Sequence, residues 1–261
     1  MPKLPKITKD NYYSPEINAA YWSASFIKQM LDCPARAMAE LRGEYVQPST
    51  TALLVGSYVD AYFEGRLDEY ILEHPEFFKR DGTMKNEFQR ADAMIKKAES
   101  DPVFMEFMRG EKQVIKTGYI GGFPFKAKFD VYLPGERIVD LKTTKDTAPV
   151  YKAGQGRISF AEAWNWPLQM AIYQRLEGNA LPCYLAVITK QDPPDIEIIE
   201  IEQHTLDAEI EVLLDKLPYF DAIRDGVIEP ERCEKCAYCR ATKVITEPKT
   251  LDKFVDYEGD N

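Results

Sequence analysis

Apolar residues recur at helical spacing along the first part of the chain, and this pattern predicts helices there. Ser23 or Ser25 is suited to cap the first helix, and Gly65 is suited to end the second. The residues before about position 20 are rich in Pro, Tyr and Asn, which predicts an extended arm. The helices are expected over about 23–41, 52–64, 84–99 and 103–108.

The apolar pattern changes its period in the middle of the chain. Residues there alternate or run β-branched, with turns at Gly121-Gly122 and at Pro134-Gly135-Glu136, which predicts a three-stranded meander. A helix is expected next, with Pro167 near its start and Gly178 just past its end. The strands are expected over 113–120, 123–133, 137–141, 183–190 and 196–202, and this helix over 164–177.

The order of these elements indicates the fold class. A last amphipathic helix begins at Thr205, so the chain reads helices, three strands, helix, two strands, helix. This order predicts an α/β fold with one mixed sheet of about five strands and helices packed on it. We expect an amino-terminal arm at 1–22, a core at 23–228 and a cysteine-bearing tail at 229–261.

Composition and charge limit the range of functions. The chain has 261 residues, 45% hydrophobic and 29% charged, which is typical of a globular domain. With 43 acidic and 33 basic residues its net charge is -10, so a nucleic-acid function needs a local basic surface, metal ions or both. No apolar run reaches the ~18 residues that cross a bilayer, so no membrane partner is expected. The amino terminus lacks an apolar signal segment, and the cytoplasm is the expected location.

Several catalytic classes lose support because their motifs are absent from the sequence. We find no GxxxxGK[ST], GxGxxG, HExxH or GxSxG motif. The two histidines, His74 and His204, lie far apart in no recognisable motif. Nucleotide hydrolysis, dinucleotide redox chemistry and a His-rich catalytic zinc site are therefore not expected.

Carboxylates and a lysine gather on the predicted meander. Asp140 and Lys142 are two apart on the third strand, so they share a face, and the hairpin could bring Asp130 beside them. Two carboxylates and a main-chain carbonyl are hard oxygen ligands suited to Mg²⁺ or Mn²⁺. The lysine could orient an attacking water or stabilise developing charge. This short pattern alone also fits a polar edge strand whose charges face solvent.

Two helical pairs extend the pattern. Gly56 and Asp60 share one face of the second helix, with Glu64 one turn further, and Gln169 and Tyr173 share a face of a later helix. A glycine lets its helix approach another backbone closely, and Asp60 could supply a third carboxylate. Each pair separately also fits ordinary packing or an ordinary surface.

In the order GxxxD, D, DxK, QxxxY, these residues resemble the PD-(D/E)XK nuclease superfamily. The RecB-like branch is the most similar, and within it the phage and prophage exonucleases of the RecE and lambda-exonuclease type. Ser25 through Cys33-Pro34-Ala35 resembles the amino-terminal signature of that branch. The resemblance runs from about Ser23 to Lys243 and implies a restriction-endonuclease-like central mixed sheet flanked by helices.

The resemblance also implies roles for single residues. It makes Asp130 and Asp140 metal ligands with the Leu141 carbonyl assisting, and Lys142 the catalytic lysine. Gln169 and Tyr173 match a helix motif that orders the site and contacts DNA. Asp60, as a further metal ligand, stands where many relatives have His, and Asp140 replaces the commoner Glu. Lys126, Lys128 and Lys145 could contact phosphate or simply be solvated.

Three cysteines cluster in the tail. Cys233, Cys236 and Cys239 lie within seven residues, and Cys33 stands far upstream. Four thiolates would suit Zn²⁺ or a [4Fe–4S] cluster, and the layout resembles that of some RecB-like nucleases, although the C-x2-C-x2-C spacing is tighter. Reduced thiols without metal are the alternative, and Cys183 is expected in the core.

The resemblance implies a Mg²⁺- or Mn²⁺-dependent exonuclease acting on duplex DNA ends. It further implies a single-strand-annealing recombinase as partner in phage-type recombination, and a homo-oligomer. The alternative is a catalytically inactive DNA-binding or assembly protein on the same fold, held by a cysteine–metal staple. Intact Asp130, Asp140 and Lys142 argue against that alternative.

Overall fold

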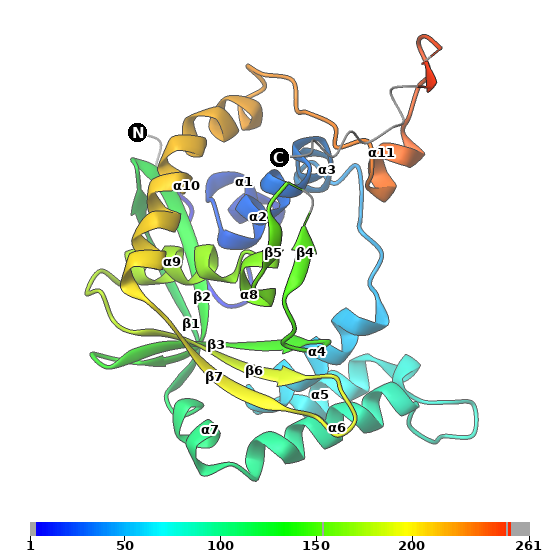
Figure 1. Ribbon diagram of the computed structural model, residues 1–261, viewed down its shortest axis with the longest axis vertical. Helices are drawn as coiled ribbons and strands as arrows, with labels where there is room; N and C mark the ends of the chain where they lie inside the picture. Colours follow the sequence, from blue (N-terminus) through cyan, green and yellow to red (C-terminus); the bar gives the residue numbers. More distant parts are fainter. Residues whose placement is uncertain (1–3, 153, 249, 252–261) are drawn as a thin grey trace.

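Five strands form a mixed central sheet in the order β1-β2-β3-β6-β7 (Figure 1). The computed structural model describes residues 4–152, 154–248 and 250–251. β3 and β6 are parallel, and the other neighbouring pairs are antiparallel. The strands are β1 (Glu111–Ile120), β2 (Phe123–Leu133), β3 (Arg137–Thr144), β6 (Cys183–Thr189) and β7 (Ile196–Ile201). The expected mixed α/β sheet is therefore confirmed.

Helices cover both faces of this sheet. One face packs with α2 (Ala24–Asp32), α9 (Trp166–Glu177) and α10 (Gln203–Arg224) into an apolar cluster that includes Phe125, Ile138 and Leu185. The other face packs with α4 (Thr51–Phe63), α6 (Asn86–Glu99) and α7 (Pro102–Phe107), around Val139 and Ala186. Ile138 and Val139 belong to opposite clusters because successive side chains of a strand point to opposite faces.

The described part of the expected amino-terminal arm is not extended throughout, because its last residues form a helix. α1 (Pro15–Ala20) begins behind Ser14, whose hydroxyl accepts from the Ile17 backbone N–H, and Ile17 is buried. Trp22 then joins the sheet, since its N–H donates to Pro124 O and its carbonyl accepts from Lys126 N, both at 2.8 Å. The segment expected to lie outside the core thus contributes to it.

The helix expected over 23–41 is two helices. Cys33 has an extended backbone between α2 and α3 (Pro34–Leu41), and Pro34 occupies the first turn of α3, where its missing N–H costs nothing. The last long helix, α10, begins at Gln203 rather than at Thr205. The helix after the meander is confirmed as α9, with Pro167 in its first turn and Gly178 in the left-handed conformation at its end.

Shorter elements complete the fold. The short helix α7 was predicted from the sequence. A second, two-stranded sheet and the other short helices of this part of the fold were not. They are α5 (Leu67–Glu73), η1 (Pro75–Phe77), β4 (Val150–Lys152), β5 (Gly156–Ile158), α8 (Phe160–Ala163) and α11 (Ala237–Ala241). Within the described residues, no helix has both the length and the apolarity needed to cross a membrane.

Candidate active site

β2 and β3 separate at the point where the acidic residues lie. Their pairing runs from Leu133 opposite Arg137 only as far as Val131 opposite Val139. Beyond it, the Leu141 N–H donates to Asp130 Oδ2 at 3.0 Å, so a carboxylate takes the place of a ladder carbonyl. Both backbone polar groups of a strand residue point to the same edge, so the Leu141 carbonyl also faces this gap.

The alternation of side chains along β2 breaks at Asp130. Phe125, Ala127 and Phe129 join the cluster against α9, yet Val131 joins the cluster on the opposite face. Opposite the break, Gln113 has φ 55°, a left-handed conformation that is uncommon outside glycine, and its amide donates to Asp130 Oδ1 at 3.2 Å. This local rotation, together with two hydrogen bonds, orients the Asp130 carboxylate.

Asp140 lies at the centre of the polar contacts. Its side chain is 1% exposed, and Oδ1 accepts from Gln169 Nε2 at 2.9 Å. Oδ2 forms an ion pair with Lys142 Nζ, as expected for residues two apart on one strand, and accepts no hydrogen bond from another described residue. Asp130, Asp140 and Lys142 all line one cavity of about 570 Å³. The convergence that the sequence predicts is therefore present.

The helical pair on α9 reaches the same cavity. Gln169 Nε2 lies 3.0 Å from the Tyr173 hydroxyl, which donates to Lys128 O at 3.2 Å. Residues four apart share a helical face, so one side of α9 connects β3 to β2. Both side chains are buried, and together they hold the two strands at the point where those strands diverge.

Sequence reasoning missed Lys28. This residue of α2 donates from Nζ to Gln169 Oε1 at 2.7 Å and lines the cavity. Burial first, and then the nearby charge of Lys142, lower the pKa of Lys28 to about 8. The sequence feature that could have identified Lys28 as a site residue is its position between Ser25 and Cys33, inside the amino-terminal signature.

Asp60 also faces the cavity, and Glu64 does not. Gly56 allows α4 to approach β3, because a Cβ at this position would lie 3.1 Å from Thr143 Oγ1. Asp60, one turn further along α4, lines the cavity beside Asp130 and Asp140. Glu64 instead forms an ion pair with Arg66. Asp60 is thus the better placed third carboxylate.

The lysines proposed as phosphate contacts differ in their surroundings. Lys126 is buried, with its Nζ donating to Tyr12 O and to Asn18 Oδ1, so it is committed to the protein. Lys128 Nζ lies 4.8 Å from the centre of the Tyr13 ring at the cavity. Lys145 is exposed and pairs with Asp146 at 3.6 Å. Only Lys128 combines a position at the cavity with a side chain that is not enclosed.

The charges of the site act strongly on one another. Burial, followed by the Asp140 carboxylate, raises the pKa of Asp60 to about 7 against the opposing effect of Lys142. Burial and the same carboxylate raise the pKa of Asp130 well above its usual range. Burial alone would lower the pKa of Lys142, but Asp140 and Asp130 outweigh it and raise that pKa. The site therefore holds an excess of closely placed negative charge.

A divalent cation fits this donor set. Asp140 Oδ2 is buried and has only Lys142 as its partner among the described residues, and like-charged carboxylates disfavour one another without a cation. Carboxylate and carbonyl oxygens are the ligands that Mg²⁺ and Mn²⁺ prefer. Asp130, Asp140 and the Leu141 carbonyl would hold the ion, with Asp60 beside them.

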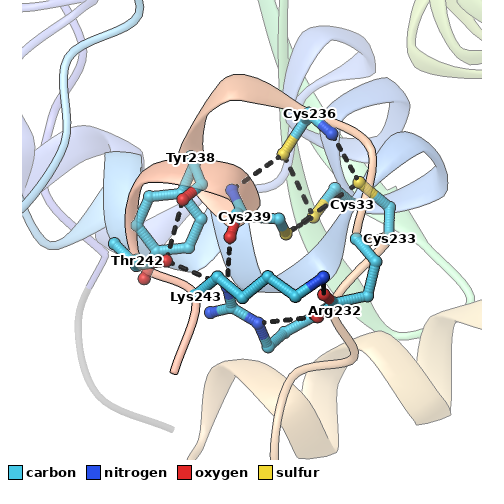
Figure 2. Close-up of polar contacts among 9 residues, drawn as sticks. Cys33, Arg232, Cys233, Cys236, Tyr238, Cys239, Thr242 and Lys243 are labelled. Carbon is cyan, nitrogen blue, oxygen red and sulfur yellow. Dashed lines mark hydrogen bonds and ion pairs between the residues drawn. The ribbon is translucent and has the colours of Figure 1, made fainter. Parts of the chain in front are cut away.

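The four expected cysteines form a second centre, shown in Figure 2, and none of them lines this cavity. Cys33, between α2 and α3, meets Cys233, Cys236 and Cys239 of the tail, and all four Sγ atoms lie within 4.8 Å of one another. In the described part of the chain, no other three Cys, His, Asp or Glu ligands are drawn so closely together. Cys183 is buried in β6 as expected.

Comparisons with known proteins agree with this geometry. The profile of the family described as "PDDEXK-like domain of unknown function (DUF3799)" matches residues 23–242. A crystal structure of a "putative exonuclease" from Eubacterium rectale is 36% identical with a TM-score of 0.93, covering 97% of this chain and 99% of that chain. The crystal structure of SSO0001 is 16% identical with a TM-score of 0.27, covering 72% and 87%, and supports no argument. No curated protein matches the chain.

Proposed function

This chain belongs to the family of PDDEXK-like domains of unknown function (DUF3799), and from that premise we propose that it is a divalent-metal-dependent nuclease that degrades duplex DNA from its ends. The observation that carries the proposal is the meeting of Asp130, Asp140 and Lys142 in one cavity, with Asp140 held between Lys142 and Gln169. A polar edge strand facing solvent would leave Asp140 exposed, yet it is 1% exposed.

Each residue of the site has a separate role in the proposed hydrolysis of a phosphodiester bond. A bound Mg²⁺ or Mn²⁺ supplies Lewis acidity toward the phosphate and charge compensation for the leaving oxygen. Asp130 and Asp140 would hold that ion, and their orientation is set by the Leu141 N–H and by Gln169. Lys142 places a positive charge at the reacting phosphate. Tyr173 keeps Gln169 in position.

Action at DNA ends is the finer part of this proposal. It is supported by the resemblance to RecE-type exonucleases and by the description of the similar Eubacterium rectale protein. The acidic chain offers Lys28 and Lys128 at the cavity as cations that could contact a DNA phosphate. A role in phage-type recombination, an annealing recombinase as partner and a homo-oligomer belong to the same proposal and rest on the resemblance alone.

Digestion of two substrates of identical sequence tests the proposal. Linear duplex DNA and the covalently closed circle are incubated with the purified protein and Mg²⁺ or Mn²⁺, and with EDTA as the metal-free control. We expect release of nucleotides from the linear form only, and none with EDTA. Equal cleavage of the circle would contradict action at ends.

Matched variants test the site. Asp140→Asn and Lys142→Met preserve side-chain size while removing charge, and each is expected to lower kcat at least about 100-fold. Lys97→Met, at an exposed position of α6, is the control for loss of a lysine charge. Activity equal to wild type in both site variants would refute the assignment. DNA binding by a wild-type protein that cleaves nothing would favour the inactive DNA-binding alternative.

A further inference from the structure

A second cavity, of about 900 Å³, adjoins the cavity of the carboxylates at the end of β3. Asp60, Leu141 and Lys142 line both cavities, so the two cavities share a wall at the residues of the proposed chemistry. The rest of the second cavity is lined by α4, by the chain that follows β3 and by the connection between α8 and α9. We call it the tryptophan cavity, because Trp164 and Trp166 both line it. A DNA strand whose phosphate reaches Lys142 could extend into it.

The two tryptophans of this cavity differ in exposure. Trp166 is 7% exposed, and Lys142 Nζ lies 5.8 Å from the centre of its ring. Trp164 is 60% exposed, and its ring presents a large apolar surface to the cavity. Leu53 and Val150 line the same cavity and are also exposed. Trp164 therefore belongs to an apolar patch in a hollow, which is typical of a binding site, and is not an isolated surface residue.

The backbone around Trp164 is held in a defined conformation. Ser159 and Glu162 form a capping box at the start of α8, with hydrogen bonds of 3.2 and 2.9 Å. Asn165 has φ 51°, in the left-handed region, and its N–H donates to Glu162 O at 2.9 Å. Pro167 then occupies the first turn of α9. Because the segment is already ordered, a ligand that contacts Trp164 loses little affinity to the ordering of the chain.

The charges of the tryptophan cavity favour an anionic ligand. Its charged residues are Lys142, Lys145 and Lys190 against Asp60 and Asp146, whereas the whole chain has 43 acidic and 33 basic residues. The Lys145 side chain is 94% exposed. An accessible aromatic ring together with cationic side chains is the combination that binds single-stranded nucleic acid, through base stacking and contacts with the phosphates.

We propose that Trp164 stacks on one unpaired base of the strand being cut, close to the nucleotide whose phosphate lies at Lys142. This inference rests on the proposed nuclease function, because it takes the strand held at Lys142 as the occupant of the tryptophan cavity. A base inside an intact duplex has both faces covered by its neighbours, so the base that contacts Trp164 is unpaired. Every base has a π-face, and Trp164 therefore strengthens binding without selecting a sequence.

Tryptophan fluorescence tests the stacking without any cleavage step. Trp22 and Trp166 are buried, so Trp164 is the tryptophan that an oligonucleotide can reach. An oligothymidylate of about 12 nucleotides is titrated in EDTA at low salt. We expect quenching in the wild type and none in Trp164→Phe, although fluorescence anisotropy shows that the variant still binds. No binding by the wild type, binding without quenching, or equal quenching in the variant would contradict the proposal.

Two oligonucleotides separate the loss of stacking from a disturbed fold. Trp164→Leu keeps an apolar side chain but removes the π-face, and it should weaken oligothymidylate binding at least about 5-fold. An abasic oligonucleotide of the same length keeps the phosphates without the bases, and its affinity should not change. Tyr119→Leu, at a 56% exposed position of β1 that lines neither cavity, is the matched control and should alter neither affinity. Equal effects of Trp164→Leu on both oligonucleotides would refute stacking.

The kinetics of DNA digestion give an independent readout. Trp164→Leu should raise KM at least about 5-fold and leave kcat within about 2-fold, because it removes binding that the substrate and the transition state share. A lower kcat with unchanged KM would contradict this role. If the wild-type protein cleaves no DNA, the proposed nuclease function fails, while the quenching experiment still decides whether Trp164 stacks on a base.

Discussion

The side-chain amide of Gln169 donates to Asp140 Oδ1 at 2.9 Å, and its carbonyl oxygen accepts from Lys28 Nζ at 2.7 Å. One neutral side chain of α9 therefore links an acidic residue of β3 to a basic residue of α2. The carboxylate is fixed in orientation by a group that carries no charge of its own. Support of this kind controls how well a ligand holds its metal.

Replacement of Gln169 should affect metal binding more than folding. Gln169→Ala leaves Asp140 Oδ1 without its hydrogen-bond donor. Loss of a contact that supports a metal ligand typically weakens metal binding about 10- to 100-fold, and we expect a decrease of this size in the apparent affinity for Mn²⁺. Gln174→Ala is the matched control, because Gln174 is equally buried on α9 but bonds to Leu181 O and Gln203. Isothermal titration with Mn²⁺ measures both variants. Equal weakening in both would show a general effect of disturbing α9.

The buried Lys126 should make stability depend on alkaline pH. Burial lowers its pKa to about 8 in the folded protein, below the ordinary lysine value of 10.5. Between these values the unfolded chain binds the extra proton, so the free energy of unfolding should rise as the pH increases from about 8 to about 10.5. Lys126→Met should lose part of this rise, since Lys28, whose pKa burial also lowers to about 8, contributes the remainder in both proteins. Urea unfolding at several pH values gives the two slopes, and parallel slopes would contradict the expected pKa.

Trp22 should be essential to the core, although the sequence prediction places it in the amino-terminal arm at 1–22. Its ring is fully buried, stacks on Phe26 at 5.1 Å and lies under the Arg224 guanidinium at 4.2 Å. We expect Trp22→Ala to lower the free energy of unfolding by about 3–5 kcal/mol. Trp22→Phe should cost much less, because the indole Nε1 has no hydrogen-bond partner among the described residues. Similar losses in both variants would contradict this account.

The approach of α4 to β3 should appear as coupling between Gly56 and Thr143. An alanine at 56 gains about 1 kcal/mol of helix propensity, but its Cβ would lie 3.1 Å from Thr143 Oγ1. Gly56→Ala alone should therefore gain little or lose stability. In a Thr143→Ala background, the same change should stabilise by nearly the full propensity term. A double-mutant cycle by urea unfolding measures the coupling, and additive effects would refute close contact.

Local patterns were sufficient for the main elements of this protein. The change from helical spacing to alternation, with glycine and proline at the turns, placed the five strands and the α9 helix because these signals depend only on near neighbours. The shared face of Asp140 and Lys142 follows from strand geometry alone. The short spacing of Cys233, Cys236 and Cys239 likewise indicated a ligand site before any contact was known.

Long-range contacts decided the rest. The rotation of β2 at Asp130 departs from the alternation that the sequence pattern implies, and it requires Gln113 and Leu141 as partners from neighbouring strands. Lys28 joins the site only because α2 packs beside α9, and Trp22 joins the sheet only because β3 leaves that edge of β2 free. A periodic pattern shows which face of an element is buried. It contains no information on which distant residue fills the space opposite, and that pairing determines both the carboxylate site and the distances among the four sulfurs.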